Sequence, residues 1–208
     1  MLLQKEREDV VKYCLEMYNR GLTVGTSGNI SIFNREQGLV AISPSSMEYN
    51  EMTAEDVVVV DVNGKVVDGK RKPSSEMETH LIFYREREDV NAVMHNHSPY
   101  ATVCACAEIT VPAITEMIVV AGADEIITAP FVKSGDKKLA NQAYKYMGKD
   151  RNVILLGSHG LLAVGPSIAD VLFFAEESEG ICATFVKAKA IGGCKILSHE
   201  DVEYDGSL

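Results

Sequence analysis

Short apolar strands joined by tight turns, with helices between them, are the feature that most limits the folds open to this chain. Residues 56–62 form an apolar run that ends at Asn63-Gly64, a dipeptide typical of two-residue hairpins. Residues 152–156 and 161–164 flank a second tight turn. Only antiparallel strands can be joined this closely. The pattern therefore predicts an α/β fold with a mainly antiparallel sheet covered by helices.

Helices are predicted between the strands from apolar stripes and capping residues. Residues 5–19 place an apolar stripe on one helical face. Ser75 and Glu78 form the pattern of a capping box, which predicts a helix that begins there. Asp136 is predicted to cap a helix to about residue 147, and Ser167 a long helix to about residue 190. Further strands are expected from residue 30 and at 39–43, 90–97, 111–114 and 125–129.

Length, charge and hydropathy narrow the classes of protein to which the chain can belong. Its 208 residues, 46% of them hydrophobic, predict a single domain over residues 1–208. The formal charge is -10, and the basic residues do not gather into a patch, so we expect no nucleic-acid partner. The N-terminus turns charged at once and no apolar stretch is long enough to span a membrane. We therefore expect a cytoplasmic protein without a membrane partner.

Three histidines form the strongest local signal for chemistry. His95 and His97 lie at the end of a predicted strand, where residues two apart point to the same face and can reach one metal ion. His159 lies in the glycine-flanked turn at 157–160. Three neutral imidazoles leave zinc an open coordination position, which suits catalysis. His80 and His199 are assigned to structural or surface roles.

Three loops rich in glycine and hydroxyl residues accompany the histidines. They are residues 25–29, 43–46 and 73–76, and the third stands at a predicted helix N-terminus. Free amides, hydroxyls and a helix dipole favour an anion such as phosphate. Plain capping and turn formation explain any one of these loops alone, whereas three in a chain with a histidine triplet favour an anion site.

The motifs together resemble the class II aldolase and epimerase family, in its order and spacing, from about residue 15 to residue 190. The matching segments are Gly25-Thr26-Ser27-Gly28-Asn29, Ile42-Ser43-Pro44-Ser45, Lys72-Pro73-Ser74-Ser75-Glu76, His95-Asn96-His97 and Ser158-His159-Gly160. The resemblance implies a three-layer αβα fold with a central, largely antiparallel mixed sheet. It also implies a homotetramer with active sites at subunit interfaces.

The same resemblance implies roles for individual residues. Zinc (Zn2+), one ion per subunit, is expected to be held by His95, His97, His159 and Glu76. Glu76 is also expected to be the catalytic base. The phosphate of a small phosphorylated ketose is expected to be held by Thr26, Gly28, Asn29, Ser45, Ser46, Ser74 and Ser75.

The activity implied is that of a zinc-dependent aldolase. We expect cleavage of L-fuculose 1-phosphate, or a close deoxy-ketose phosphate, to dihydroxyacetone phosphate and L-lactaldehyde. Zinc would act as a Lewis acid that stabilises the enediolate left by carbon–carbon cleavage, without a Schiff-base lysine. Glu76 would supply the proton that completes dihydroxyacetone phosphate.

Departures from the family pattern keep other outcomes open. Glu116 stands where the fuculose enzymes have a tyrosine that reaches in from a neighbouring subunit, and carboxyl groups are far stronger acids than phenols. Ser46 stands where glycine is usual, and the short tail offers only Tyr204 to cover the site. The alternatives are epimerisation of L-ribulose 5-phosphate at C4 and dehydration of methylthioribulose 1-phosphate. Glu116 is expected to be a catalytic residue in the aldolase as well as in these alternatives.

A structural zinc site is the alternative from a different class. Closed structural sites are generally rich in cysteine, and no pair among the five cysteines has the ligand spacing. A displaceable carboxylate beside three histidines favours catalysis instead.

Overall fold

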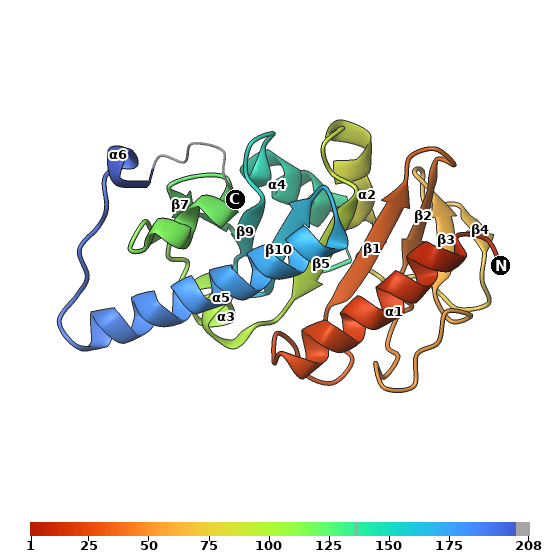
Figure 1. Cartoon of the computed structure of the whole chain (residues 1–208), viewed down its shortest axis with the longest axis horizontal. Coiled ribbons are helices and arrows are strands. Elements are labelled where there is room, and N and C mark those ends of the chain that lie inside the picture. The colour runs from red at the N-terminus through yellow and green to blue at the C-terminus, as the bar shows by residue number, and fades with distance from the viewer. Residues whose placement is uncertain (136, 203–208) are drawn as a thin grey trace.

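Our computed structural model describes residues 1–135 and 137–202. An eight-stranded sheet forms the centre of this fold (Figure 1). Its strands are β1 (Asn29–Asn34), β2 (Leu39–Ile42), β3 (Val58–Asp61), β4 (Val66–Asp68), β5 (Ala92–Asn96), β8 (Thr128–Ala129), β9 (Val153–Leu156) and β10 (Gly160–Gly165), in the order β4-β3-β2-β1-β5-β10-β9-β8. Every neighbouring pair is antiparallel except β8 with β9. The predicted largely antiparallel mixed sheet is confirmed.

Helices cover both faces of this sheet. They are α1 (Gln4–Asn19), α2 (Met77–Glu86), α3 (Pro99–Cys106), η1 (Glu116–Ala121, a 3-10 helix), α4 (Lys137–Met147), α5 (Ile168–Ala190) and α6 (His199–Val202). In Figure 1, α1 and α5 cross the front of the sheet, whereas α2 and α4 lie behind it. The arrangement is the expected three-layer αβα fold.

Successive residues of the central strands pack into different layers, which explains their uninterrupted apolar sequences. Val59 belongs to the buried cluster that contains residues of α1 and α5, whereas its neighbours Val58 and Val60 belong to the cluster that contains residues of α2 and α4. Leu161 and Leu162 of β10 divide in the same way. A strand that is buried on both faces has no polar alternation to reveal its period.

Several local predictions differ from the structure. The prediction of a capping box at Ser75 and Glu78 is wrong, because α2 begins at Met77. The hydroxyl that accepts from the backbone there is Oγ of Ser74, which accepts a hydrogen bond from the Glu76 amide at 3.2 Å. Glu78 instead pairs with Arg85 along the helix. The expected strand at 125–129 is two strands, because β7 (Glu125–Ile126) pairs with β6 (Val111–Pro112) in a separate sheet.

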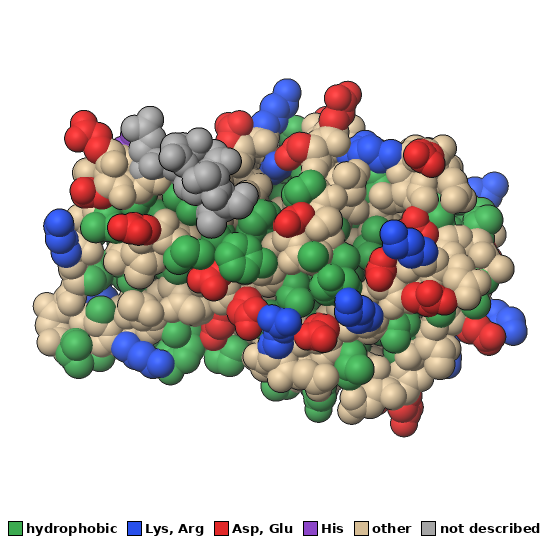
Figure 2. Space-filling model, viewed as in Figure 1, with side chains coloured by type: hydrophobic (Ala, Val, Ile, Leu, Met, Phe, Trp, Pro, Cys, Tyr) green, Lys and Arg blue, Asp and Glu red, His purple; other side chains and the backbone are tan. Residues whose placement is uncertain are grey.

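Other predictions have different outcomes. Ser167 caps α5 as predicted, since its Oγ accepts from the Asp170 amide at 3.3 Å. Asp136 and Tyr204 lie outside the described residues. No helix within 1–135 or 137–202 is long and apolar enough to cross a membrane. On the face shown in Figure 2, acidic and basic side chains are interspersed.

The buried guanidinium of Arg7 joins α1 to the β3–β4 edge of the sheet. Its side chain is 2% exposed. Nη1 donates to the carbonyl of Val57 at 2.5 Å, Nε donates to the carbonyl of Leu2 at 2.8 Å, and Nη2 pairs with Asp68 at 2.6 Å. One cation therefore satisfies acceptors from three segments of the chain.

Replacement of Arg7 tests this linkage. We expect Arg7→Leu to lower the free energy of unfolding by about 3 kcal/mol, because it leaves buried acceptors without donors. Arg20→Leu is the matched control, since the Arg20–Glu176 pair is exposed and its loss should cost less than about 1 kcal/mol. Urea denaturation measures both values. Equal losses in the two variants would contradict a special role for Arg7.

Candidate functional site

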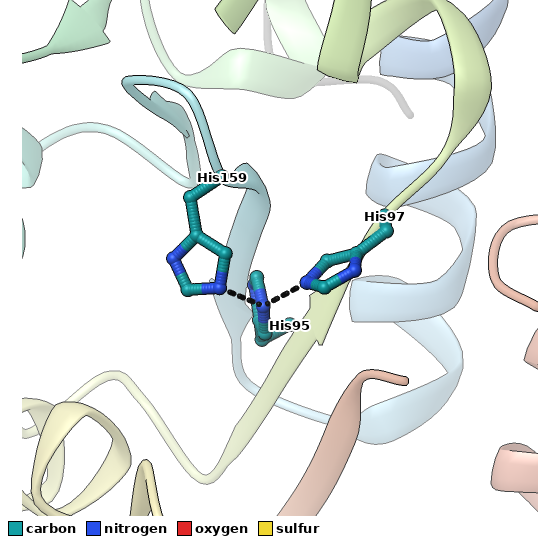
Figure 3. A group of neighbouring side chains, drawn as sticks. All are labelled: His95, His97 and His159. Carbon is teal, nitrogen blue, oxygen red and sulfur yellow. Dashed lines mark hydrogen bonds between the residues drawn. The ribbon is translucent and has the colours of Figure 1, made fainter. Parts of the chain in front are cut away.

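Three imidazoles meet at the end of β5 and the turn between β9 and β10 (Figure 3). Nε2 of His95 lies 3.0 Å from Nε2 of His97 and 3.1 Å from Nε2 of His159. One ligand atom from each residue lies within 4.8 Å of the others. Three nitrogens that converge in this way can bind one metal ion.

The protonation of His95 fits metal binding. Its Nδ1 lies 2.9 Å from the Leu161 carbonyl, an acceptor, so the ring proton belongs on Nδ1 and Nε2 carries the lone pair. Burial first, then the neighbouring His159 and His97, holds the pKa of His95 well below its usual value. Burial and His159 also lower the pKa of His97. Neutral imidazoles are the form that binds metals.

The carboxylate of Glu76 completes the cluster. Its Oε1 lies 3.3 Å from Nε2 of His159, and its Oε2 lies 3.4 Å from Nε2 of His95. Nδ2 of Asn29 donates to Oε2 at 3.1 Å. Three nitrogens and one oxygen form a donor set that suits zinc and related divalent ions. The five cysteines, all among the described residues, are free thiols and take no part in this set.

Close packing of the backbone places the histidines. Gly160, the first residue of β10, lies against β5: a Cβ there would overlap the Asn96 carbonyl oxygen and approach the His97 ring at 2.9 Å. Gly28 lies as tightly on the other side, since a Cβ would lie 2.8 Å from the His95 carbonyl oxygen. Its φ of +84° also favours glycine. Two glycines thus let neighbouring segments approach the ligands.

A cavity of about 180 Å³ opens beside the cluster. Its lining comprises Thr26, Ser27, Gly28, Asn29, Pro44, Ser45, Ser46, Ser74, Ser75, Glu76, His95, His97, Ser134 and His159. None of these described lining residues is lysine or arginine. An anion in the cavity would therefore be held by hydroxyls, amides and a metal ion.

Two of the hydroxyl-rich loops are joined by backbone hydrogen bonds. The Ser45 amide donates to the Lys72 carbonyl at 3.0 Å, and the Ser74 amide donates to the Ser43 carbonyl at 3.1 Å. Ser46 has a φ of +57°, in the left-handed region where residues other than glycine are uncommon. The pairing holds the hydroxyls of both loops on one side of the cavity.

The structure brings together all the residues expected from the sequence except one. Glu116 begins η1, is exposed and does not belong to the described cavity lining. Sequence reasoning missed Ser134, whose only signal is a serine before a glycine in a loop. It also gave His80 no part in the site, although this residue is hydrogen-bonded to Asn29. The separation of 51 positions gave no signal for that contact.

Comparison with known proteins gives consistent matches over nearly the whole chain. Residues 8–186 match the family described as the class II aldolase and adducin N-terminal domain. A 5-deoxy-D-ribulose 1-phosphate aldolase from Bacillus thuringiensis serovar kurstaki is 49% identical, over 98% of this chain and 94% of its own. An L-fuculose phosphate aldolase from Haemophilus influenzae is 37% identical, over 94% of this chain and 89% of its own. The solved structure of an L-fuculose 1-phosphate aldolase superposes with a TM-score of 0.91 at 38% identity, over 95% of this chain and 92% of that chain.

Proposed function

The chain belongs to the class II aldolase family and is a metal-dependent aldehyde-lyase, and we propose that it cleaves a 5-deoxypentulose 1-phosphate. The products are dihydroxyacetone phosphate, from C1 to C3, and acetaldehyde, from C4 and C5. The observation that carries the choice of sugar is the 49% identity to a 5-deoxy-D-ribulose 1-phosphate aldolase, against 37% to an L-fuculose phosphate aldolase.

Two residues further support a sugar other than L-fuculose 1-phosphate. Glu116 and Ser46 are the positions at which the chain departs from the pattern of the fuculose enzymes. Ser46 lines the cavity, so its hydroxyl alters the space beside the bound substrate. L-fuculose 1-phosphate remains the second candidate, because the fold superposes closely on an L-fuculose 1-phosphate aldolase.

We propose zinc as the metal, one ion per subunit, held by His95, His97 and His159 with Glu76 as a displaceable fourth ligand. The support is the converging set of three nitrogens and one carboxylate. When bound, the ion would supply a Lewis acid that withdraws electron density from the substrate carbonyl.

Two carboxyl groups account for the protons of the reaction. As the C3–C4 bond breaks, its electron pair goes to C3, the hydroxyl on C4 loses its proton and C4 becomes the aldehyde carbon. Glu76 takes a proton from water and gives it to C3, which leaves it as the carboxylate again; in the direction of synthesis it takes this proton back from C3. We assign removal of the hydroxyl proton on C4 to Glu116, which then returns that proton to water, so that no proton is gained or lost over the cycle. Because Glu116 lies away from this subunit's cavity, it would act from a neighbouring subunit of a homotetramer.

The phosphate is assigned to the hydroxyl-rich side of the cavity. Thr26, Gly28, Asn29, Ser45, Ser46, Ser74 and Ser75 would hold it. Such a site binds a dianion through hydrogen bonds and without a cationic side chain.

We also propose that residues 1–208 form a single domain and that the protein is located in the cytoplasm.

A panel of sugar phosphates tests the substrate. The enzyme is stripped with a chelator, and both the stripped protein and the protein reloaded with zinc are incubated with 5-deoxy-D-ribulose 1-phosphate, L-fuculose 1-phosphate, L-ribulose 5-phosphate and methylthioribulose 1-phosphate. We expect kcat/KM for the 5-deoxypentulose to exceed that for L-fuculose 1-phosphate by about tenfold or more, as one extra carbon commonly changes kcat/KM by that factor. NMR identifies the products.

The other outcomes of the panel separate the alternatives. Faster cleavage of L-fuculose 1-phosphate would replace the proposed sugar. An isomeric pentulose phosphate, or loss of water from methylthioribulose 1-phosphate without cleavage, would replace aldol cleavage itself. Full turnover by the stripped protein would contradict the proposed metal site.

A further inference from the structure

A chain of buried polar side chains runs away from the cavity behind Glu76. Asn29 joins Glu76 to His80, with Oδ1 of Asn29 2.5 Å from Nε2 of His80. Nδ1 of His80 lies 2.7 Å from Oγ of Ser31, which lies 2.6 Å from the hydroxyl of Tyr84. Each of the five side chains belongs to a residue less than 9% exposed.

The secondary structure explains how these residues meet. Glu76, His80 and Tyr84 are spaced four apart at the start of α2 and along it, so they share one helix face. Asn29 and Ser31 are two apart on β1, so they share one face of the sheet. The helix face lies on the strand face, and Asn29 pairs in register with His95. This row of buried polar side chains therefore ends beside the histidine cluster.

The negative charge of Glu76 determines which group donates and which accepts in each hydrogen bond of this row of buried side chains. A carboxylate only accepts, so the amide of Asn29 must present Nδ2 to Glu76 and Oδ1 to His80. His80 must then carry its proton on Nε2, and the lone pair on Nδ1 must accept from Ser31. Because the hydroxyl hydrogen of Ser31 goes to His80, the Tyr84 hydroxyl is the donor to Oγ of Ser31, and the carbonyl of Ser31, at 2.9 Å, is a second acceptor for the same hydrogen.

The state of His80 is compatible with this pattern. The residue is fully buried, and burial lowers its pKa to about 3, so the ring is neutral at physiological pH. A neutral imidazole offers one donor and one acceptor, which is what Asn29 and Ser31 require. Were the Asn29 amide rotated by half a turn, two acceptors, Oδ1 of Asn29 and the carboxylate, would face each other at Glu76.

We propose that His80 is a positioning residue that, through Asn29, anchors Oε2 of Glu76 and leaves Oε1 facing the metal cluster and substrate. This inference rests on the proposed function, in which Glu76 carries a proton. Nδ2 of Asn29 has a second hydrogen, so anchoring Glu76 leaves one donor for the phosphate. A carboxylate released from the metal by the substrate would thus remain held beside the reacting carbon.

Variants of His80 separate positioning from simple packing. His80→Leu removes the donor to Asn29, and His80→Gln retains an N–H near the position of Nε2. We expect His80→Leu to lower kcat by about 10–100-fold, because a misplacement of about 1 Å can cost that much. KM should change by less than about threefold, since ground-state binding is retained. His80→Gln should recover most of kcat.

NMR of the zinc-loaded protein gives a readout independent of turnover. We expect the ring of His80 to be protonated at Nε2 and bare at Nδ1, and the Asn29 side-chain amide signal to shift in His80→Leu but to stay near the wild-type position in His80→Gln. Ser31→Ala, which removes the donor to Nδ1, should lower kcat less than His80→Leu does. It also serves as the second variant if His80→Leu does not fold.

The outcomes are distinct. A folded His80→Leu protein with wild-type kcat and an unmoved Asn29 amide signal would overturn the proposal, as would a His80 ring protonated at Nδ1. Equal losses of kcat in His80→Leu and His80→Gln would also overturn it, by showing a role in packing alone. If the wild-type enzyme cleaves no ketose phosphate, the proposed function fails, and the amide signal of Asn29 still decides whether His80 positions it.

Discussion

Glu76→Gln is expected to lower kcat by about 10²–10⁴-fold, the usual contribution of a general acid or base. The amide matches the carboxylate in shape but cannot exchange a proton with C3 of the substrate. Asn29 can still donate to the amide oxygen, and the three histidines can still bind metal, so the fold and zinc content should remain. Steady-state kinetics with the preferred ketose phosphate and metal analysis of the purified variant measure these effects.

Glu78→Gln is the matched control for that substitution. Glu78 lies two residues further along α2, with its side chain 33% exposed and paired with Arg85 rather than with the cluster. The kcat of Glu78→Gln should remain within about twofold of wild type, because substitutions on the surface usually have small effects on the rest of the structure. Wild-type kcat in Glu76→Gln would exclude Glu76 as the proton carrier and leave it a role as metal ligand alone.

The histidine cluster could be predicted from the sequence because its signals are local. His95 and His97 are two apart on one strand, and a strand fixes their common direction. His159 stands in a turn whose glycines are visible in the sequence. The sheet could be predicted for the same reason, since the turns at residues 63–64 and 157–160 determine which strands pair. The order of the sheet could not, because β1 pairs with β5 through a contact about 60 positions apart.

The predictions that failed depended on contacts from distant segments. Ser75 and Glu78 fit a capping box, but the segment before α2 is fixed by its pairing with residues 43–45, which moves the helix start to Met77. His80 was assigned to a structural or surface role, and the structure buries it fully. Its hydrogen bond to Asn29 could not be predicted, because it depends on α2 lying over β1. The place of Glu116 could not be tested in a single subunit, because we propose that it acts in the cavity of a neighbouring subunit.

Close packing between β10 and β5 makes Gly160 a position where substitution should disturb the structure. Its Cα is the point where β10 meets the end of β5, and both His95 and His97 border it. A methyl group at this point would lie 2.9 Å from Cδ2 of His97 and 3.2 Å from Cε1 of His95, besides overlapping the Asn96 carbonyl oxygen. The nearest of these atoms is the backbone oxygen, so the end of β5 must shift, and His95 and His97 must shift with it.

Gly160→Ala should therefore weaken metal binding as well as the fold. We expect the metal dissociation constant to rise by about 10–100-fold, the range found when groups that orient metal ligands are disturbed. The free energy of unfolding of the metal-free protein should fall by about 1–3 kcal/mol from overpacking. Competition with a chromophoric chelator measures the first value, and urea denaturation of the stripped protein measures the second.

Gly180→Ala supplies the control, because it makes the same chemical change on α5 where no atom lies within 4 Å of the new Cβ. That variant should be more stable than wild type by about 0.4–1 kcal/mol, since alanine loses less backbone entropy in a helix. Its metal affinity should not change. If Gly160→Ala bound metal as tightly as Gly180→Ala, the histidine cluster would have to tolerate displacement, and the close approach of β10 to β5 would have no part in setting the metal site.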